Sequence, residues 1–376
     1  MERIGVFGGT FNPIHAQHVE VLKEAIATLQ LDKMIVMPTF MPPHKNKAPA
    51  PAIDRLNMLR LAVGNISKVE VSDYEIEKGG KSYTYQTMEH LKSVYPNAEL
   101  FFLVGADMLK DFKTWKYPER ILSACTLVAC GRDNSGVSEA EEEKYFLERF
   151  NKSFIKLSYS GKDFSSTKIR VYTSLGVSLQ GVCIPAVEEY IKTHNLYEGG
   201  EYEAFIKKVL TEKRIRHTAN VIITALKKEK ETGLDEEKIK TSALLHDCAK
   251  YLDPKDYPDF TMPEGVPDPV VHAYLGAYVA EKVLKITDEE IIDAIRYHTS
   301  GKANMSTLAK LIFVADMIEE DRFYQGVEEL RKAYEVGLDY CFKECLKEET
   351  VHLLNRKKPI YVETLNAYEY YINGDK

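Results

Sequence analysis

With 376 residues, the chain is too long for one ordinary hydrophobic core, which predicts two domains. Hydrophobic residues make up 44% and charged residues 28%, the usual balance of a soluble globular protein, and the lack of long apolar runs argues against a membrane span. The net charge of −7 lies in residues 201–376, with 26 basic and 33 acidic side chains, whereas residues 1–200 have 24 of each. Neither half has the basic surface that non-specific nucleic-acid binding requires.

The first half alternates between strand-like and helix-like segments. The predicted strands are Ile4–Phe7, Met34–Met37, Val69–Val71, Leu100–Val104, Thr126–Ala129 and Phe154–Leu157. Helices are predicted over Val19–Leu29, Arg55–Val63, Thr84–Val94 and Glu139–Phe150. This order predicts a Rossmann-like α/β domain, in which a parallel sheet is covered on both faces and ligands bind at the carboxyl ends of the strands.

The pattern changes at Gly199-Gly200, after which almost every segment is typical of an amphipathic helix. The predicted helices are Tyr202–Lys230, Lys238–Ala249, Tyr274–Leu284, Asp288–Tyr297, Ser306–Glu319 and Val327–Leu346. We therefore predict an α/β domain over residues 1–198, a linker over 199–202 and an all-α domain over 203–376.

Cysteine usage and the start of the chain indicate the compartment. The six cysteines are scattered and form no CxxC pair, so neither a disulfide framework nor a cysteine zinc site is expected. The residues after Met1 run directly into a strand-like segment and give no signal-peptide pattern. We expect a protein of the reducing cytoplasm. The sequence allows a homo-oligomer but does not predict one.

A glycine-rich segment, Gly8–His18, follows the first predicted strand. Its glycines let backbone N–H groups approach a phosphate closely, and the following helix N-terminus adds positive partial charge. His15 and His18 are three residues apart, so they share one helix face and can donate hydrogen bonds to the same anion. By itself, the segment is more typical of an ordinary glycine turn with two surface histidines.

A second polar segment, Phe164–Arg170, places hydroxyl groups ahead of basic residues. Its serines can cap a helix, and Thr167, Lys168 and Arg170 supply donors for a polyphosphate. Together the two segments resemble the adenylyltransferase and cytidylyltransferase superfamily, whose members carry HxGH after the first strand and an ISSTxxR-like motif near the end of the fold. Gln17 stands where HxGH normally has glycine, so close backbone approach is less free there.

Three further segments resemble the nicotinate-nucleotide adenylyltransferases: Pro42–Lys45, Ser82–Thr87, and Gly105–Asp107 with Trp115 following. This resemblance covers about residues 1–197. It implies transfer of AMP from ATP, with Mg²⁺ on the polyphosphate, to nicotinate mononucleotide, giving deamido-NAD and pyrophosphate. A nucleotidylyltransferase that acts on phosphopantetheine or nicotinamide mononucleotide is the alternative.

The resemblance also implies a role for each matching residue. The candidate catalytic residues are His15, His18, Lys45 and Arg170, with His18 nearest the reacting phosphorus. The nicotinate carboxylate is assigned to Thr84, the pyridine ring to Trp115 and a ribose hydroxyl to Asp107. The candidates for binding ATP and the mononucleotide are Gly8, Gly9, Thr10, Asn12, Thr84, Gly105, Asp107, Trp115, Ser166, Thr167 and Ile169. Because the attacking phosphate is already an anion, catalysis needs alignment and charge stabilisation rather than a strong base.

The helical half contains a second set of chemically distinct residues. Imidazole and carboxylate groups suit divalent iron, manganese or zinc. A single helical histidine is usually structural, but the adjacent pair His246-Asp247 follows an apolar segment, where both are costly without a metal or a partner. The sequence therefore predicts a metal site formed by His217, His246, Asp247 and Asp316.

This series resembles the HD phosphohydrolases, whose metal ligands follow the order H…HD…D. The neighbouring residues resemble more closely the bacterial HD-domain symmetrical bis(5'-nucleosyl)-tetraphosphatases, over about residues 203–373. That resemblance implies cleavage of diadenosine tetraphosphate into two ADP, with one or two ions of iron, manganese or another divalent metal. It makes Asp247 catalytic and assigns the nucleotide to Arg214, His272, His298, Thr299 and Arg322.

Two alternatives stay open for the helical half. One is a nucleotide-sensing module that does not hydrolyse its ligand, and the other is a phosphohydrolase acting on nucleoside mono- or diphosphates. The sequence also leaves open whether the two predicted sites are coupled.

Overall fold

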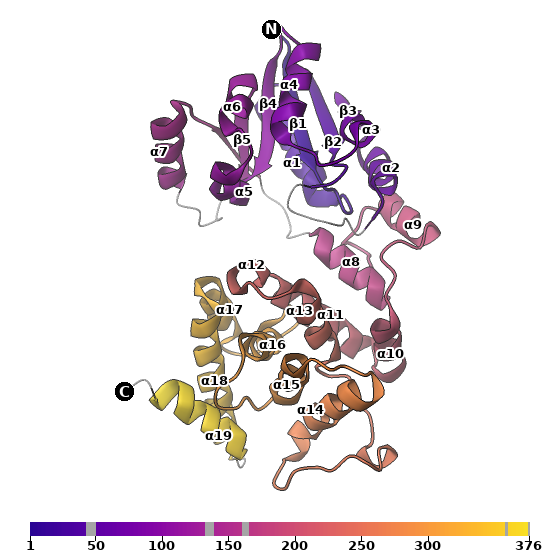
Figure 1. The fold of residues 1–376 in the computed structure, drawn as a ribbon, viewed down its shortest axis with the longest axis vertical. Coiled ribbons are helices and arrows are strands. Elements are labelled where there is room, and N and C mark those ends of the chain that lie inside the picture. The colour runs from indigo at the N-terminus through magenta and orange to yellow at the C-terminus, as the bar shows by residue number, and fades with distance from the viewer. Residues whose placement is uncertain (43–49, 132–138, 160–164, 358–359, 375–376) are drawn as a thin grey trace. The chain divides into compact units, whose positions relative to one another are not determined.

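The computed structural model describes residues 1–42, 50–131, 139–159, 165–357 and 360–374. The chain divides into two compact units. The first consists of residues 1–170 and 179–197, and the second of residues 171–178 and 198–376. Figure 1 shows that the first unit combines a sheet with helices, whereas the second is helical. The predicted fold class, an α/β domain followed by an all-α domain, is confirmed.

Six parallel strands form the sheet of the first unit in the order β3-β2-β1-β4-β5-β6. They are β1 (Arg3–Gly9), β2 (Lys33–Pro38), β3 (Val69–Val71), β4 (Glu99–Gly105), β5 (Thr126–Gly131) and β6 (Ile155–Ser158). Each predicted strand lies on one of them. The strand order reverses between β1 and β4, and open α/β sheets bind ligands beyond the carboxyl ends of the strands at such a point. The segment Gly8–His18 leaves the sheet there.

Both faces of the sheet are covered because successive side chains of a strand point to opposite faces. One face carries Ile4, Val6 and Phe102, which form a buried cluster with α4 (Thr84–Val94), α6 (Pro118–Ala124) and α7 (Glu139–Phe150). Against the strands also pack α1 (Ala16–Thr28) and α2 (Ala52–Val63). The remaining helices are α3 (Tyr74–Lys78), α5 (Ala106–Asp111), the short η1 (Phe112–Thr114), α8 (Ser166–Leu175) and α9 (Pro185–Thr193).

The second unit is built around α16 (Thr307–Ile318), most of whose residues are buried. Around it pack α11 (Glu212–Leu226), α13 (Glu236–Leu245), α15 (Glu289–Tyr297), α17 (Val327–Val336) and α18 (Leu338–Asn355). The other elements are α10 (Glu201–Val209), α12 (Glu229–Thr232), η2 (Pro254–Asp256), α14 (Asp268–Tyr278), η3 (Val279–Val283), α19 (Val362–Tyr368) and η4 (Glu369–Asn373). Within the described ranges, no helix is both long enough and apolar enough to cross a membrane.

Two long helices predicted in this half are each divided in the structure. The predicted helix Tyr202–Lys230 breaks after Val209, because the Thr211 hydroxyl accepts the backbone N–H of Arg214 and starts a new helix. The predicted helix Val327–Leu346 breaks at Gly337, which separates α17 from α18. At Gly337 the apolar spacing continues across the break, so periodicity alone does not reveal it, whereas the first break lies at a run of four polar residues, 211–214.

Candidate active sites

The loop after β1 meets the following helix at His15. β1 ends at Gly9 and α1 begins at Ala16, so His15 is the residue that precedes the helix. Its backbone N–H donates to Nδ1 of His18 across 3.2 Å, and the two rings stack with centroids 3.7 Å apart. The structure therefore brings together the two imidazoles that the sequence placed on one face, at a helix end that favours an anion.

The proton of His18 has a defined position. Burial, and secondarily the neighbouring His15 ring, hold the pKa of His18 well below its ordinary value of 6.5, so the ring is neutral near pH 7. Because Nδ1 accepts the backbone N–H of His15, the ring proton lies on Nε2. His18 thus offers one N–H donor to a phosphate oxygen.

Position 17 does not require glycine in this structure. Gln17 lies in the first turn of α1 and has no positive φ. Its side-chain amide donates to the hydroxyl of Tyr159, which follows β6. The departure from the HxGH pattern therefore places no strain on the backbone and gives the helix a side-chain contact to the sheet edge.

The two signature segments, about 150 residues apart in sequence, meet through hydrogen bonds. The Ser166 hydroxyl donates to the carbonyl of Pro13 across 2.8 Å, and Nη1 of Arg170 donates to the carbonyl of Asn12 across 2.8 Å. A second Arg170 nitrogen donates to the Thr167 hydroxyl at 3.1 Å. The N-terminus of α8 and the loop after β1 consequently form one site.

The remaining predicted residues of this site are spread over several elements. Thr84 begins α4, and Gly105 ends β4. Trp115 is half-buried and packs on Phe112, with ring centroids 5.2 Å apart. Ile169 is fully buried, so its side chain is part of the core. Lys45 and the side chain of Asp107 lie outside the described residues.

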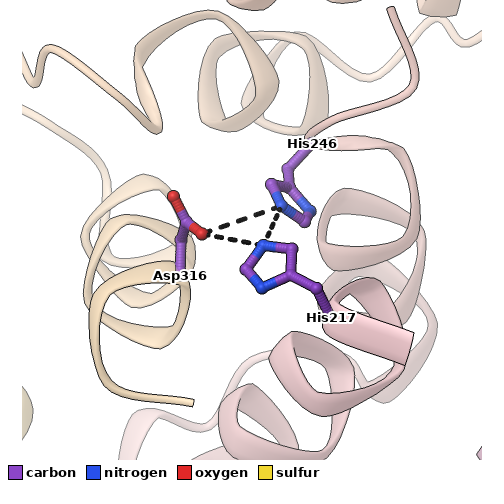
Figure 2. Close-up of side chains that lie close together, drawn as sticks. All are labelled: His217, His246 and Asp316. Atoms are coloured by element: carbon purple, nitrogen blue, oxygen red, sulfur yellow. Dashed lines mark hydrogen bonds and ion pairs between the residues drawn. The ribbon is translucent and has the colours of Figure 1, made fainter. Parts of the chain in front are cut away.

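The predicted metal-binding residues of the second unit converge from separate helices. His217 lies on α11, His246 and Asp247 follow α13, and Asp316 lies on α16. Nε2 of His217 is 3.0 Å from Oδ1 of Asp316 and 3.4 Å from Nε2 of His246. Figure 2 shows these three side chains pointing toward one another. One ligand atom of each lies within 4.8 Å of the others.

A second group of donor atoms adjoins the first through Asp247. Its Oδ2 lies 3.5 Å from Nε2 of His246, whereas its Oδ1 lies 3.1 Å from Nε2 of His272 and 3.6 Å from Nε2 of His298. His246, Asp247 and His298 form the second set of possible metal ligands, also within 4.8 Å. Thr299 lies beside it, with its hydroxyl 3.0 Å from Nε2 of His298. Asp247 therefore lies between two groups of imidazoles.

Hydrogen bonds fix the direction in which three imidazoles point their lone pairs. Nδ1 of His246 lies 2.6 Å from the carbonyl of Ala243, and Nδ1 of His298 lies 2.8 Å from the carbonyl of Ile295. Nδ1 of His217 faces Oε1 of Glu319 at 3.0 Å. Carbonyl and carboxylate oxygens only accept, so each Nδ1 carries a proton, and each Nε2 is the nitrogen left to present a lone pair to a bound cation. Without a cation, Nε2 of His217 faces Oδ1 of Asp316 at 3.0 Å, and against the effect of burial the hydrogen bonds to Asp316 and Glu319 raise the pKa of His217.

This donor set fits a divalent metal. Nε2 lone pairs and carboxylate oxygens face one another in a buried region, and Oδ1 of Asp247 accepts no hydrogen bond among the described residues. Such an arrangement of acceptors is unfavourable unless a cation lies between them. Neutral imidazoles and ionised carboxylates are also the ligands that divalent iron, manganese and zinc share.

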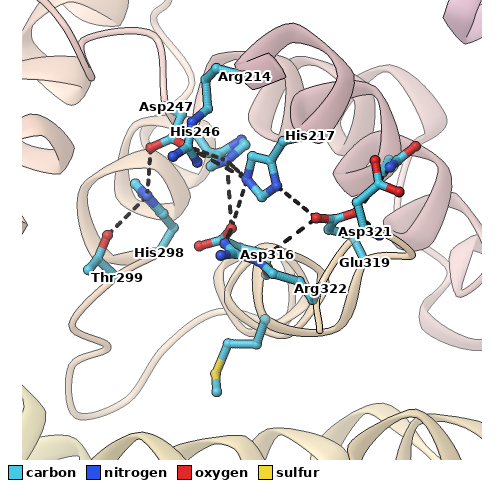
Figure 3. A network of polar contacts seen from close by, with 12 residues as sticks. Arg214, His217, His246, Asp247, His298, Thr299, Asp316, Glu319, Asp321 and Arg322 are labelled. Carbon is cyan, nitrogen blue, oxygen red and sulfur yellow. Dashed lines mark hydrogen bonds and ion pairs between the residues drawn. The ribbon is translucent and has the colours of Figure 1, made fainter. Parts of the chain in front are cut away.

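Two arginines flank the carboxylates, as Figure 3 shows. Arg214 donates to Oδ2 of Asp247 across 2.6 Å, and Arg322 pairs with Oδ1 of Asp316. Burial alone would raise the pKa of both aspartates. At Asp316 the positive charge of Arg322 outweighs burial, and at Asp247 the surrounding imidazoles do so in the metal-free chain when Nε2 carries a proton, so both pKa values lie well below the ordinary range.

Two family models match the chain, one in each half. Residues 6–171 match the cytidylyltransferase-like model, and residues 214–321 match the HD domain model. A probable nicotinate-nucleotide adenylyltransferase of Clostridium tetani is 37% identical over 199 residues, which cover 52% of this chain and 100% of that protein. The chain belongs to the nicotinate-nucleotide adenylyltransferase family.

Similarity extends beyond this adenylyltransferase domain. A probable nicotinate-nucleotide adenylyltransferase/Ap4A hydrolase of Mycoplasma pneumoniae is 28% identical over 354 residues, covering 89% of this chain and 98% of that protein. A crystal structure of an HD superfamily hydrolase involved in NAD metabolism, from Clostridium acetobutylicum, covers 46% of this chain and 96% of its own, with 28% identity and a TM-score of 0.42. In this chain the adenylyltransferase domain is followed by the residues that match the HD domain model.

The adenylyltransferase domain contains a positioning residue that the motifs do not reveal. Arg55 on α2 is fully buried and has no carboxylate partner among the described residues. Its guanidinium donates to the carbonyls of Thr10, Thr39 and Phe40 at 2.7–2.9 Å and to that of Ala50 at 3.2 Å. It therefore ties the loop after β1 to the loop after β2. Its helix also contains Asp54 and Arg60, so the sequence alone does not mark Arg55 as the buried one.

The HD domain likewise contains two polar residues that were not assigned a role from sequence. Oε1 of Glu319 contacts Nδ1 of His217, the ring nitrogen away from the other ligands. Nζ of Lys250 lies 3.1 Å from Nε2 of His272 and 3.7 Å from Oδ1 of Asp247. Both lie within residues 214–321, which match the HD domain model, but their short spacing from Asp316 and Asp247 does not by itself predict which way their side chains point.

Proposed function

We propose that the chain catalyses two reactions on adenine nucleotides. The adenylyltransferase domain transfers AMP from ATP to nicotinate mononucleotide, giving deamido-NAD and pyrophosphate. The HD domain hydrolyses diadenosine tetraphosphate to two ADP. The first proposal rests on the similarity to the Clostridium tetani protein over that protein's whole length, and the second on the convergence of the H…HD…D residues in a chain similar to the Mycoplasma hydrolase.

In the adenylyl transfer, an oxygen of the mononucleotide phosphate attacks the α-phosphorus of ATP. The bond from that phosphorus to the bridging oxygen breaks, and pyrophosphate leaves with the electron pair. His18 donates from Nε2 to an oxygen of the reacting phosphate, and Arg170 and Thr167 bind the polyphosphate near the N-terminus of α8. Mg²⁺ enters as part of the ATP complex and offsets its charge.

For the mononucleotide, we assign the pyridine ring to the exposed side of Trp115 and the carboxylate to the N-terminus of α4 at Thr84. Asp107 keeps its assignment to a ribose hydroxyl, and we assign the positive charge of Lys45 to the polyphosphate. Incubation of the full chain with ATP and each acceptor in turn tests this function. Pyrophosphate release with nicotinate mononucleotide supports it, whereas turnover of phosphopantetheine or nicotinamide mononucleotide alone contradicts it.

In the HD domain, His217, His246, Asp247 and Asp316 would hold a divalent metal, and His272 and His298 stand where a second would bind. A metal bound there polarises a phosphate and lowers the pKa of water. Arg214 and Arg322, already paired with the ligand carboxylates, offset phosphate charge.

Symmetrical hydrolysis breaks the bridge between the second and third phosphorus atoms of diadenosine tetraphosphate. The water oxygen bonds to one of these phosphorus atoms, and the bond from that same phosphorus to the bridging oxygen breaks. The ADP that contains the other phosphorus leaves with the bridging oxygen, and the water protons pass to solvent or to the products. Product analysis after loading the full chain with iron or manganese tests this activity. ADP as the sole product supports it, AMP with ATP indicates asymmetrical cleavage, and no product indicates a sensing module.

A further inference from the structure

The proposed metal ligand His217 is hydrogen-bonded, through the ring nitrogen that faces away from the metal site, to a buried carboxylate. Glu319 is 2% exposed, and its Oε1 accepts the Nδ1 proton of His217 at 3.0 Å. Its other oxygen accepts from Nδ2 of Asn220 at 3.0 Å and from the backbone N–H of Asp321 at 2.7 Å. Figure 3 shows Glu319 on the side of His217 opposite His246 and Asp247. Glu319 thereby sets which nitrogen of His217 faces the metal site.

The hydrogen bonds continue to a residue outside the stretch that matches the HD model. Asn220 is 1% exposed, and its Oδ1 accepts from the hydroxyl of Tyr172 at 2.9 Å. Tyr172 is fully buried, lies in the part of α8 that belongs to the second unit, and precedes the matched residues 214–321. Its hydroxyl also lies 3.2 Å from Oε1 of Glu320.

The shortest contacts of this series share one direction of donation, although the Tyr172 hydroxyl has Oε1 of Glu320 as a second acceptor at 3.2 Å. The phenol donates to the amide oxygen of Asn220, the amide nitrogen donates to Glu319, and Glu319 accepts from His217. If the Asn220 amide were turned over, its oxygen would face the Glu319 carboxylate, and two acceptors would be opposed. The Glu319 carboxylate therefore selects the amide orientation, and the Tyr172 hydroxyl stabilises the same orientation by donating to the amide oxygen, which holds Asn220 against Glu319.

We propose that Tyr172, Asn220 and Glu319 are positioning residues of the metal site. Acting through His217, they fix its tautomer and ring direction, so that its Nε2 lone pair points at the site. A carboxylate on the far nitrogen of a ligand histidine also raises the basicity of that ligand, and losing such a partner typically weakens metal binding about 10–100-fold. This inference rests on the proposed metal site, but on no particular nucleotide substrate.

Titration of the metal-free full chain with Mn²⁺, without nucleotide, tests the proposal. Glu319→Gln should weaken the tightest Mn²⁺ binding about 10–100-fold. Tyr172→Phe, which removes one hydroxyl and keeps the ring, should weaken it about fivefold, the usual effect of one buried hydrogen bond. Tyr334→Phe is the matched control, because the Tyr334 hydroxyl is also buried and donates at 2.9 Å, but to the carbonyl of Thr224. It should bind Mn²⁺ as the unmodified chain does.

A purely structural role of these residues gives a different result. In that case Tyr172→Phe and Tyr334→Phe lower the unfolding temperature of the metal-free chain similarly, and neither changes Mn²⁺ affinity; this outcome overturns the proposal. The double variant is a second check. If Tyr172 acts through Glu319, then adding Tyr172→Phe to Glu319→Gln changes Mn²⁺ affinity little, whereas independent effects would multiply. An unmodified chain that binds neither Mn²⁺ nor Fe²⁺ would remove the proposed site itself, whichever nucleotide is hydrolysed.

Discussion

The two domains handle negative charge in opposite ways. In the adenylyltransferase domain, the described site presents donors: the Nε2 proton of His18, the guanidinium of Arg170 and the N-terminal turns of α1 and α8. In the HD domain, Asp247 and Asp316 bring their own negative charge into a buried site, and three imidazoles point lone pairs at it. The first site is suited to receive an anion, and the second to receive a cation.

This difference predicts how each site responds to the loss of one residue. Several donors share the charge of a bound polyphosphate, so one missing donor leaves the others in place. A metal site has few ligands, and Asp247 lies between both groups of imidazoles. Substitutions in the HD site should therefore have larger effects than matched substitutions in the adenylyltransferase site.

Asp247→Asn is expected to have the largest effect. It removes the carboxylate that faces both groups of imidazoles, so hydrolysis of diadenosine tetraphosphate should fall by about 10³-fold or more. Adenylyl transfer by the same preparation should be unchanged. Asp253→Asn is the control, since Asp253 is exposed and caps the short helix η2. Hydrolysis that survives in Asp247→Asn would show that the site does not depend on this ligand.

A buried arginine provides the next test, on the side of the adenylyltransferase domain. Arg55→Met leaves the carbonyls of Thr10, Thr39, Phe40 and Ala50 without their donor, which should cost about 3 kcal/mol of unfolding free energy. Trp115, the only tryptophan, lies in this domain, so its fluorescence during urea unfolding reports this domain separately. An unchanged transition would mean that Arg55 does not hold the two loops. Hydrolysis by the HD domain should be retained in the folded protein.

His18→Ala should lower the kcat of adenylyl transfer by about 10²-fold, the usual effect of losing one transition-state donor. The matched control is His194→Ala, because His194 is exposed and stacks on Tyr190 in the same unit. Comparison with Asp247→Asn tests the contrast between the two sites directly. If His18→Ala proved the more damaging substitution, shared donation by several groups would be the wrong description of the first site.

The sequence predicts the parts of this molecule that depend on local pattern. Strand and helix alternation indicates the parallel sheet, and Ser165 caps α8 as expected, since its hydroxyl accepts the backbone N–H of Lys168. The H…HD…D order likewise indicates residues that converge in the fold. These features could be predicted from the sequence because each depends on residues a few positions apart or on a motif of known spacing.

Other features were not predictable because they depend on partners far away in sequence. Arg55 bonds to carbonyls of two loops, and Tyr172 reaches Asn220, 48 positions later. No periodicity or short motif indicates such pairs. The helix breaks have local causes instead, because the Thr211 hydroxyl caps α11 and Gly337 separates α17 from α18.

The smallest expected effect concerns pH, and it again separates the two domains. Burial, and then the neighbouring His15, lower the pKa of His18, so the folded domain binds this proton less tightly than the unfolded chain does. The contribution of neutral His18 to the unfolding free energy is fully present above the ordinary pKa of 6.5. It is lost as pH falls from 6.5 toward the lowered pKa of the folded domain. In the metal-free HD domain, the histidines do not all change the unfolding free energy in the same direction as pH falls. Hydrogen bonds to Asp316 and Glu319 outweigh burial and raise the pKa of His217, whereas burial lowers the pKa of His246 and lowers that of His272 to about 4.

Urea unfolding followed by Trp115 fluorescence at several pH values between 7.5 and 5 tests this expectation. His18→Asn keeps an oxygen that can accept the backbone N–H of His15 but cannot titrate. The unmodified domain should therefore lose more stability than this variant as the pH falls below 6.5, and the two should show parallel pH dependence above it. Equal losses across the whole range would mean that His18 is protonated as readily in the folded domain as in the unfolded chain, and that the neutral Nε2 donor assigned to the adenylyl-transfer site is wrong.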